Sequence, residues 1–332
     1  MQIMFSSKDF ILVVDKPKGQ SSFWVVNKVK KLSGIKKVGH TGTLDPLATG
    51  VLPICVGEAT KISDLLMHGD KIYVAKIKMG VRTDTLDAEG VVTETGKRPY
   101  ELVTEDEFLK VLNLFSGNII QIPPMYSAIK KDGVPLYKLA RLGQNIDREG
   151  RQVNVQKIEL LEFAPPYAEI KVYCSKGTYI RTLVDDIGEK LSTLAHVTEL
   201  KRVASGIFDI TQAIKFDAAT SVESLLNRAL SIEEVVSKIL PVLKVEPRLA
   251  IRIANGFQLS YTDLMSIERD VNKWGSASNV ALFSDTVSGE QKILAILKII
   301  PQDFEDLINM NSSSKIAKTL RIFHNEEWRA QS

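Results

Sequence analysis

One short segment combines the residue types that catalysis most often uses. Residues 39–50 read GHTGTLDPLATG, with three glycines and a single carboxylate, Asp45. Glycine permits positive φ angles and lets a ligand approach the backbone closely. A lone carboxylate in such a loop could act as a nucleophile or as a general base. Composition alone favours a simpler interpretation, a tight turn in which Asp45 bonds to its own backbone.

Other catalytic and metal sites find no support in the sequence. It contains no Gly-x-x-x-x-Gly-Lys phosphate loop, no Gly-x-Gly-x-x-Gly fingerprint and no Gly-x-Ser-x-Gly elbow. The four histidines are far apart and the two cysteines cannot form a cysteine-rich site, so we expect no metal. An aspartyl phosphatase would carry a second acid where this chain has Leu47. The acidic residues at 84–89 lack the calcium-loop pattern and predict a turn.

The elements that must hold the 39–50 loop can be predicted from the spacing of apolar residues. Proline and glycine within 15–19 predict a turn. A helix should follow, capped by Ser21 or Ser22 and ended by Gly34, because apolar residues recur there at helical spacing. The other expected elements are strands at 51–56, 71–79 and 169–174, helices at 59–67 and 221–236, and a helix after 176–178.

Beyond Pro241 the sequence changes to short segments typical of strands, and this change predicts a second domain. Short strands are expected at 250–253, 280–283, 292–299 and 319–323. We therefore expect two domains, 1–242 and 243–332. Strands and helices mix without a strict βαβ rhythm, which favours an α+β fold.

Composition and charge limit the class of protein. With 332 residues, 44% hydrophobic and 25% charged, the chain matches a globular protein and excludes collagen, a disordered tail and a histone-like binder. Two cysteines fit a reducing compartment, no apolar run could span a bilayer, and the first ten residues lack an apolar signal core. We therefore expect a cytoplasmic protein. The net charge of +3 is uneven, since residues 1–61 carry +5 and residues 243–332 carry zero.

At residues 39–61 the sequence resembles the catalytic motif of the TruB family of pseudouridine synthases. Six blocks resemble family motifs in the family's order, at 15–22, 39–61, 71–90, 121–130, 176–181 and 200–206. The continuation LATGVLP is similar to the bacterial stand-alone branch, not to relatives that work with guide RNAs. The resemblance implies an α+β pseudouridine synthase fold with a mixed, mostly antiparallel sheet, followed by a small β-rich PUA-like domain.

The resemblance also implies an activity. The stand-alone branch isomerises uridine 55 in the TΨC arm of elongator tRNAs: it breaks the N1–C1′ bond, turns the uracil and rejoins it through C5. This reaction has no redox change and no group donor, so no cofactor is expected. The implied partner is tRNA, without a guide RNA or a membrane, and a monomer is the default. Two rivals stay open, a tRNA-binding chaperone and a synthase that acts on ribosomal RNA.

By the same resemblance, three residues form the catalytic set. Asp45 stands beside C1′ and C2′ of the target nucleotide as nucleophile or base. Arg181 keeps it ionised, since a guanidinium can hold a carboxylate through two hydrogen bonds. Tyr73 stacks on the uracil, and its hydroxyl helps to remove the C5 proton. The residues alone leave other roles open: a helical ion pair between Arg181 and Asp185, and a place in the core for Tyr73.

The resemblance assigns a further set of residues to RNA binding. Uridine 55 lies in a folded arm and must flip out to react. By the resemblance, His40 fills the vacated space and Leu200 packs on the target base. Lys16 and Lys18 neutralise phosphates. Without the resemblance, a loop histidine, a core leucine and solvated lysines explain the same positions. The set is His40, Gly42, Thr43, Leu200, Lys16 and Lys18.

Overall fold

The structure, a computed structural model, describes residues 8–217, 219–259, 261–268, 279–286, 289–299 and 317–323. The chain divides into two compact units. The first contains Leu12–Cys55 and Ile62–Arg228. The second contains Val56–Lys61 and the described part of Ala229–Ser332. Within the described residues, no helix is long and apolar enough to cross a membrane.

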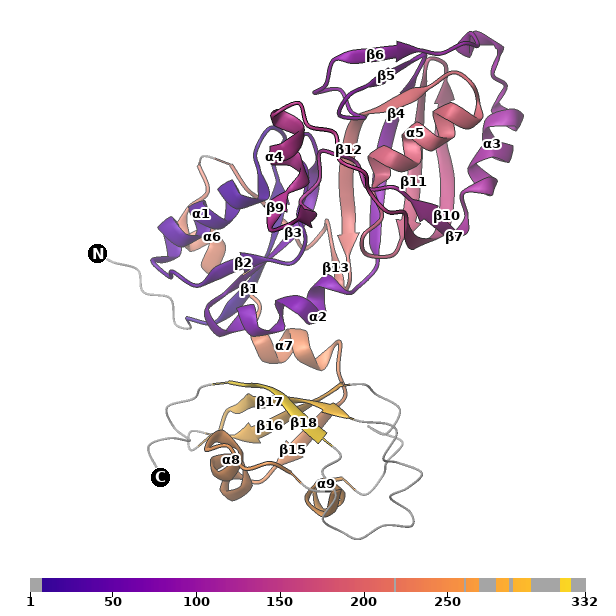
Figure 1. Cartoon of the computed structure of the whole chain (residues 1–332). Helices are drawn as coiled ribbons and strands as arrows, with labels where there is room; N and C mark the ends of the chain where they lie inside the picture. The colour runs from indigo at the N-terminus through magenta and orange to yellow at the C-terminus, as the bar shows by residue number, and fades with distance from the viewer. Residues whose placement is uncertain are drawn as a thin grey trace, which may run out of the picture. The chain divides into compact units, whose positions relative to one another are not determined.

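The largest element is a mixed sheet that runs in the order β14-β1-β3-β12-β4-β11-β10-β7, with β13 beside β12 and β2 beside β3 (Figure 1). The neighbours from β12 to β7 pair antiparallel, whereas β1 pairs with β14, and β3 with β12, in parallel. The sheet is therefore mixed and mostly antiparallel. Its strands are β1 (Phe10–Lys16), β2 (Val38–His40), β3 (Thr49–Val56), β4 (Lys71–Met79), β7 (Gly117–Gln121), β10 (Arg151–Ala164), β11 (Tyr167–Cys174), β12 (Ala195–Ser205), β13 (Phe208–Asp209) and β14 (Ile214–Lys215).

Helix α5 (Ile180–Lys190) lies against β12 and β4 on one face of this sheet (Figure 1). Its apolar residues at helical spacing are buried, among them Ile180, Leu183 and Ile187. In β4 the alternate residues Ala75 and Ile77 are buried as well. Since side chains alternate along a strand, Lys71 and Tyr73 share their face. Strand alternation and the helical stripe thus bring one end of β4 and the start of α5 together.

The ends of α1 (Ser22–Ser33) follow the predicted capping pattern. The hydroxyl of Ser21 accepts a hydrogen bond from Trp24 N (3.1 Å). Gly34 ends the helix with a φ of 72°, a conformation that glycine adopts without strain. The other elements of the first unit are α2 (Ser63–Met67), β5 (Val81–Thr83), β6 (Val92–Thr95), η2 (Tyr100–Leu102), α3 (Glu105–Leu114), β8 (Lys130–Lys131), β9 (Val134–Pro135), α4 (Leu136–Arg141) and α6 (Val222–Leu226), and η1 (Gly57–Ile62) precedes α2.

The second unit contains a four-stranded sheet in the order β15-β16-β17-β18. Its core comes from both strands and helices, and includes Leu243, Ile253, Leu264 and Leu294. The expected strands at 280–283, 292–299 and 319–323 correspond to β16, β17 and β18. The elements are α7 (Ile232–Ser237), β15 (Val242–Val245), α8 (Pro247–Ala254), α9 (Tyr261–Ile267), β16 (Asn279–Asp285), β17 (Gln291–Ile299) and β18 (Ala317–Ile322).

The strand predicted at 250–253 is wrong, because this segment forms α8. Pro247 occupies the first turn of the helix, where its missing N–H costs nothing. Ala250 and Ile253 are buried three residues apart, which is helical spacing. The short window at 250–253 did not include the proline that starts the helix.

Candidate active site

A hydrogen-bonded frame fixes the loop that carries Asp45. Ser22 holds the residue before it, since its Oγ accepts from Leu44 N (2.8 Å) and donates to Leu44 O (3.1 Å). Gly19 N holds the residue after it by donating to Pro46 O (2.8 Å). The turn and the helix start predicted from the sequence therefore anchor the loop on both sides of its carboxylate.

Lys16 belongs to this frame, and the structure contradicts its predicted contact with phosphate. Its side chain has no exposed surface. Its Nζ donates to the carbonyl oxygens of Pro17 (2.9 Å), Gln20 (2.6 Å) and Pro46 (3.2 Å). Burial lowers the pKa of Lys16 to about 8, although the charge of Asp45 opposes this. A lysine enclosed in this way supports the loop and does not reach a phosphate.

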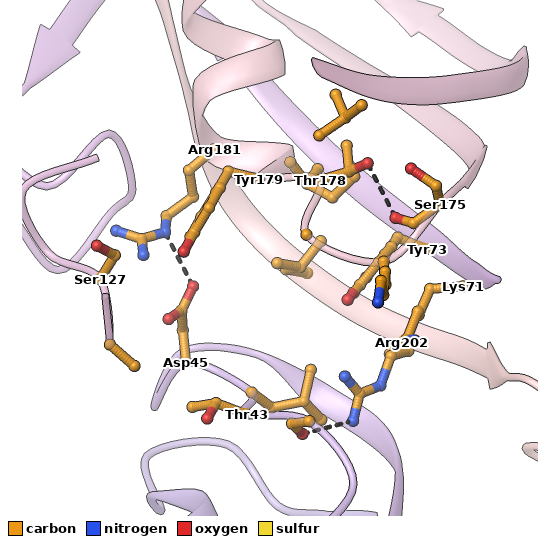
Figure 2. A pocket seen from close by; sticks show the side chains of 18 of the residues that line it. Thr43, Asp45, Lys71, Tyr73, Ser127, Ser175, Thr178, Tyr179, Arg181 and Arg202 are labelled. Atoms are coloured by element: carbon orange, nitrogen blue, oxygen red, sulfur yellow. Dashed lines mark hydrogen bonds and ion pairs between the residues drawn. The ribbon is translucent and has the colours of Figure 1, made fainter. Parts of the chain in front are cut away.

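The structure brings Arg181 and Asp45 into an ion pair (Figure 2), with Arg181 Nε 2.9 Å from Asp45 Oδ2. Arg181 is almost fully buried. Its two terminal nitrogens donate to Thr85 O (2.8 Å) and Tyr126 O (2.7 Å). The guanidinium is therefore held on three sides and presents a fixed edge to the carboxylate. The alternative helical pair with Asp185 is not formed, since Asp185 pairs with Arg82 (2.6 Å).

Two carboxylates share the Arg181 guanidinium. Asp87 Oδ2 lies 3.7 Å from Arg181 Nη1 and is almost fully buried. Burial raises the pKa of Asp45, the charge of Arg181 lowers it, and the charge of Asp87 raises it again. Asp45 keeps about a third of its side chain exposed. Asp45 is thus the carboxylate that a ligand can reach, while the buried Asp87 places a second negative charge beside Arg181.

Tyr73 faces this pair from β4. It stands directly opposite Arg202 in the register of β4 and β12. Burial raises the pKa of Tyr73, and a hydrogen bond with Arg202 opposes this rise. Arg202 is fixed in turn, because its Nε donates to Val51 O (2.7 Å) and its Nη2 to Gly42 O (3.2 Å). Leu200, two residues earlier in β12, is largely buried.

These side chains surround a pocket of about 520 Å³. Figure 2 shows Asp45, Arg181 and Tyr179 on one side of it, and Tyr73 and Arg202 on the other. This volume lies within the range of about 300–1,000 Å³ that is common for small-molecule sites. The pocket therefore brings together all three predicted catalytic residues, together with Leu200, Gly42 and Thr43.

The other predicted RNA-binding residues lie outside the lining of this pocket. His40 is half-buried, and its Nδ1 accepts from Gly42 N (3.3 Å). Burial lowers the pKa of His40, so the ring favours its neutral form. Lys18 is exposed. Its assignment to a phosphate stays a prediction.

Polar residues of the pocket region that were not predicted from the sequence include Lys71, Asp87, Tyr179 and Arg202. Three of these four lie two positions from a predicted residue: Lys71 from Tyr73, Tyr179 from Arg181, and Arg202 from Leu200. In strands β4 and β12, a spacing of two places side chains on the same face, so 71 with 73 and 200 with 202 could have been recognised. Asp87 lies in the segment predicted as a turn, and Thr83 Oγ1 does donate to Asp87 O (2.7 Å) there.

Comparison with known proteins connects this geometry to a family. The TruB family pseudouridylate synthase N-terminal domain matches residues 30–180, and the tRNA pseudouridylate synthase B C-terminal domain matches residues 181–241. The tRNA pseudouridine synthase B of Clostridium tetani is 49% identical over 228 residues, which cover 69% of this chain and 78% of that protein. The chain belongs to the TruB family of pseudouridine synthases. It is accordingly an isomerase that forms pseudouridine.

Two further TruB-family proteins have similar identity to this chain. The tRNA pseudouridine synthase B of Haemophilus influenzae is 41% identical over 279 residues, with coverage of 82% of this chain and 88% of that protein. The protein of the same name from Stutzerimonas stutzeri is 50% identical over 207 residues, with coverage of 62% and 67%. Both confirm the predicted family.

Solved structures confirm the predicted fold class. A crystal structure of a Cbf5-Nop10-Gar1 complex matches with a TM-score of 0.68 and 25% identity, over 99% of this chain and 88% of that chain. The structure of an H/ACA RNP bound to a substrate RNA matches with a TM-score of 0.66 and 22% identity, over 96% and 86%. The second likeness establishes the fold alone. The TruB-family chain thus has a pseudouridine synthase fold with a mixed sheet, and a further β-rich sheet near its C-terminus.

Proposed function

We propose that this chain converts uridine 55 to pseudouridine in the TΨC arm of elongator tRNAs. The names of its relatives support tRNA as the substrate. One observation carries the proposal. A single reachable carboxylate, Asp45, lies in a nucleoside-sized pocket with Arg181 Nε 2.9 Å away. This is the group that the breakage of an N1–C1′ bond requires.

The target uridine enters the pocket by flipping out of its arm, which costs a few kcal/mol of unstacking. Asp45 then acts at the sugar in one of two ways. It either bonds to C1′ as the N1–C1′ bond breaks, or removes the C2′ proton to leave a glycal. In both routes the uracil departs, turns, and bonds to C1′ through C5. Asp45 is released or returns the proton to C2′, while C5 loses its proton and N1 gains one.

Arg181 and Tyr73 support this reaction from fixed positions. Entry of the base removes water from Asp45, which raises the pKa of the carboxyl group, and the adjacent guanidinium opposes that rise. Because Arg181 is bound to two backbone oxygens, it does not follow the ligand. Tyr73 stacks on the uracil, Leu200 packs on it, and the Tyr73 hydroxyl assists removal of the C5 proton.

The rest of the chain serves RNA binding in this proposal. His40 fills the space that the flipped base leaves, Gly42 and Thr43 line the entrance, and exposed Lys18 contacts a phosphate. Residues 1–242 form the catalytic domain, and 243–332 form a PUA-like domain on the acceptor stem. The enzyme acts in the cytoplasm as a monomer without a guide RNA, a cofactor or a metal. Residues 47–53 of this chain resemble the bacterial stand-alone branch, which supports activity without a guide RNA.

Mapping of modified sites tests this assignment. The full chain is expressed in cells whose own enzyme for position 55 is deleted, and pseudouridine is mapped across total RNA. We expect it to reappear at position 55 of elongator tRNAs. New sites in ribosomal RNA, with position 55 unmodified, would favour the rival synthase. Restored tRNA folding without any new pseudouridine would favour the chaperone.

A further inference from the structure

The catalytic pocket has two sides with different charge. On the first side, Asp45 is influenced by Arg181, Asp87 and Lys16, so that carboxylates and cations balance. On the second side, around Tyr73, the buried charged groups are Lys71 and Arg202, beside the neutral polar side chains of Ser175 and Thr178 (Figure 2). Neither of these two cations forms an ion pair with a carboxylate within the described part of the chain. The second side therefore carries positive charge that the described residues leave unbalanced.

Lys71 is the buried cation of this second side. It lies two residues before Tyr73 in β4, on the same face, and only 5% of its side chain is exposed. Its Nζ donates to Met67 O (2.5 Å) and Gly69 O, at the end of α2. An ammonium group has three donors, so one remains for a ligand. Burial lowers the pKa of Lys71 to about 8.

The titratable groups that influence Lys71 come from several elements. In order of their influence they are Arg202, Cys174, Asp70 and Lys176. Asp70 is exposed and accepts a hydrogen bond from Gln156 Nε2 (2.6 Å), so it is engaged outside the pocket. Lys176 is exposed, with its Nζ 3.0 Å from the ring of His68. None of these neighbours is a buried carboxylate that would neutralise Lys71.

The proposed reaction creates a charge that suits this side of the pocket. When the N1–C1′ bond breaks, its electron pair stays on N1, and the detached uracil is an anion. Its charge spreads over the O2 and O4 oxygens. This holds whether Asp45 bonds to C1′ or forms a glycal. The anion persists until C5 bonds to C1′, so the pocket must stabilise it while the base turns.

We propose that Lys71 binds the detached uracil anion through its third N–H, with Arg202 as a second fixed cation beside Tyr73. The inference rests on the proposed function and deepens it. Preorganised cations stabilise developing charge strongly in a site that excludes water. A flanking RNA phosphate is the other anionic oxygen that could use this position. The uracil is favoured, because Lys71 is buried beside the tyrosine that faces the base, whereas phosphates remain at the surface.

The first test separates chemistry from binding. Single-turnover rates at saturating RNA, and dissociation constants, are measured for Lys71→Gln and Lys71→Arg on a TΨC-arm RNA. We expect Lys71→Gln to lower the saturating rate about 100-fold, with affinity nearly unchanged, and Lys71→Arg to restore most of the rate. Lys78→Gln, the same change on the opposite face of β4, serves as the control and should match wild type. Weakened affinity with an unchanged saturating rate would instead identify a phosphate site and overturn the proposal.

A pH profile gives a second test that does not need Lys71→Gln to fold. Lys71 loses its charge above a pH of about 8, so the wild-type saturating rate should fall as pH rises through this value. Lys71→Arg keeps its charge and should show no such fall. The same fall in both proteins would overturn the proposal. If wild type forms pseudouridine and Lys71→Gln matches its rate, this inference fails while the proposed function stands.

Discussion

Arg181 Nε and Asp45 Oδ2 lie 2.9 Å apart, although one residue belongs to the first turn of α5 and the other to a loop between β2 and β3. The arginine is almost fully buried and bound to two backbone oxygens. The aspartate keeps part of its surface open to the pocket. The pair therefore joins a fixed cation to an accessible anion, which is the arrangement that the proposed chemistry needs.

Replacement of Arg181 by lysine should show that the shape of the cation matters as well as its charge. Lysine cannot donate to Asp45, Thr85 O and Tyr126 O at once in the geometry of a guanidinium. We expect a loss of about 100-fold in the single-turnover rate, with RNA affinity retained. Arg98→Lys, at a partly exposed pair with Glu107 outside the pocket lining, is the matched control. Equal rates for Arg181→Lys and wild type would refute a positioning role.

The dependence of the saturating rate on pH, on the acidic side, should follow the ionisation of Asp45. Burial raises the pKa of Asp45 above the ordinary value of 3.8, and Arg181 opposes the rise. Because the reaction needs the ionised form, the saturating rate should fall as pH falls, with a midpoint above 3.8. Removal of the cation in Arg181→Met should move this midpoint to higher pH. A midpoint that stays in place, or moves to lower pH, would contradict the electrostatic account.

The two neighbouring lysines should differ in their response to salt. Lys18 is exposed, so Lys18→Gln should reduce the slope of log affinity against log salt by about 1. Lys16 is buried and holds three carbonyl oxygens, so Lys16→Gln should lower the rate and leave the salt slope unchanged. Binding titrations at several salt concentrations measure both effects. A smaller salt slope for Lys16→Gln, with an unchanged slope for Lys18→Gln, would indicate that Lys16 contacts a phosphate.

Removal of the Ser22 hydroxyl should weaken the frame of the catalytic loop. Ser22→Ala leaves the N–H and the carbonyl oxygen of Leu44 without their partner in a buried place. An unpaired buried polar group costs about 1–3 kcal/mol, so urea unfolding should reveal a loss of that size. Ser237→Ala, at an exposed position of α7, should change stability by less than about 0.5 kcal/mol. Equal stability for the two variants would argue against this anchor.

Local elements could largely be predicted from the sequence, because their causes are local. The cap and the glycine that bound α1 lie beside the helix that they define. A strand was wrongly predicted at 250–253 because Pro247, which starts α8, lies before this short segment. The α+β fold class was predictable from the mixture of strand and helix patterns.

The site was harder to predict, because its contacts cross the chain. Residue patterns alone favoured a turn for Asp45 and a helical pair for Arg181, and only the family resemblance suggested that they meet. The burial of Lys16 depends on carbonyl oxygens, one of them at Pro46, and backbone acceptors leave no signal in residue types. Tyr126 likewise acts through its backbone, because its carbonyl oxygen holds Arg181.

The central claim is that the carboxylate of Asp45 performs the isomerisation. The most direct measurement is the single-turnover formation of pseudouridine on a TΨC-arm RNA by Asp45→Asn, which keeps the side-chain shape and removes the charge. We predict that the variant binds the RNA with nearly wild-type affinity and forms no detectable pseudouridine. Turnover at the wild-type rate would contradict the account.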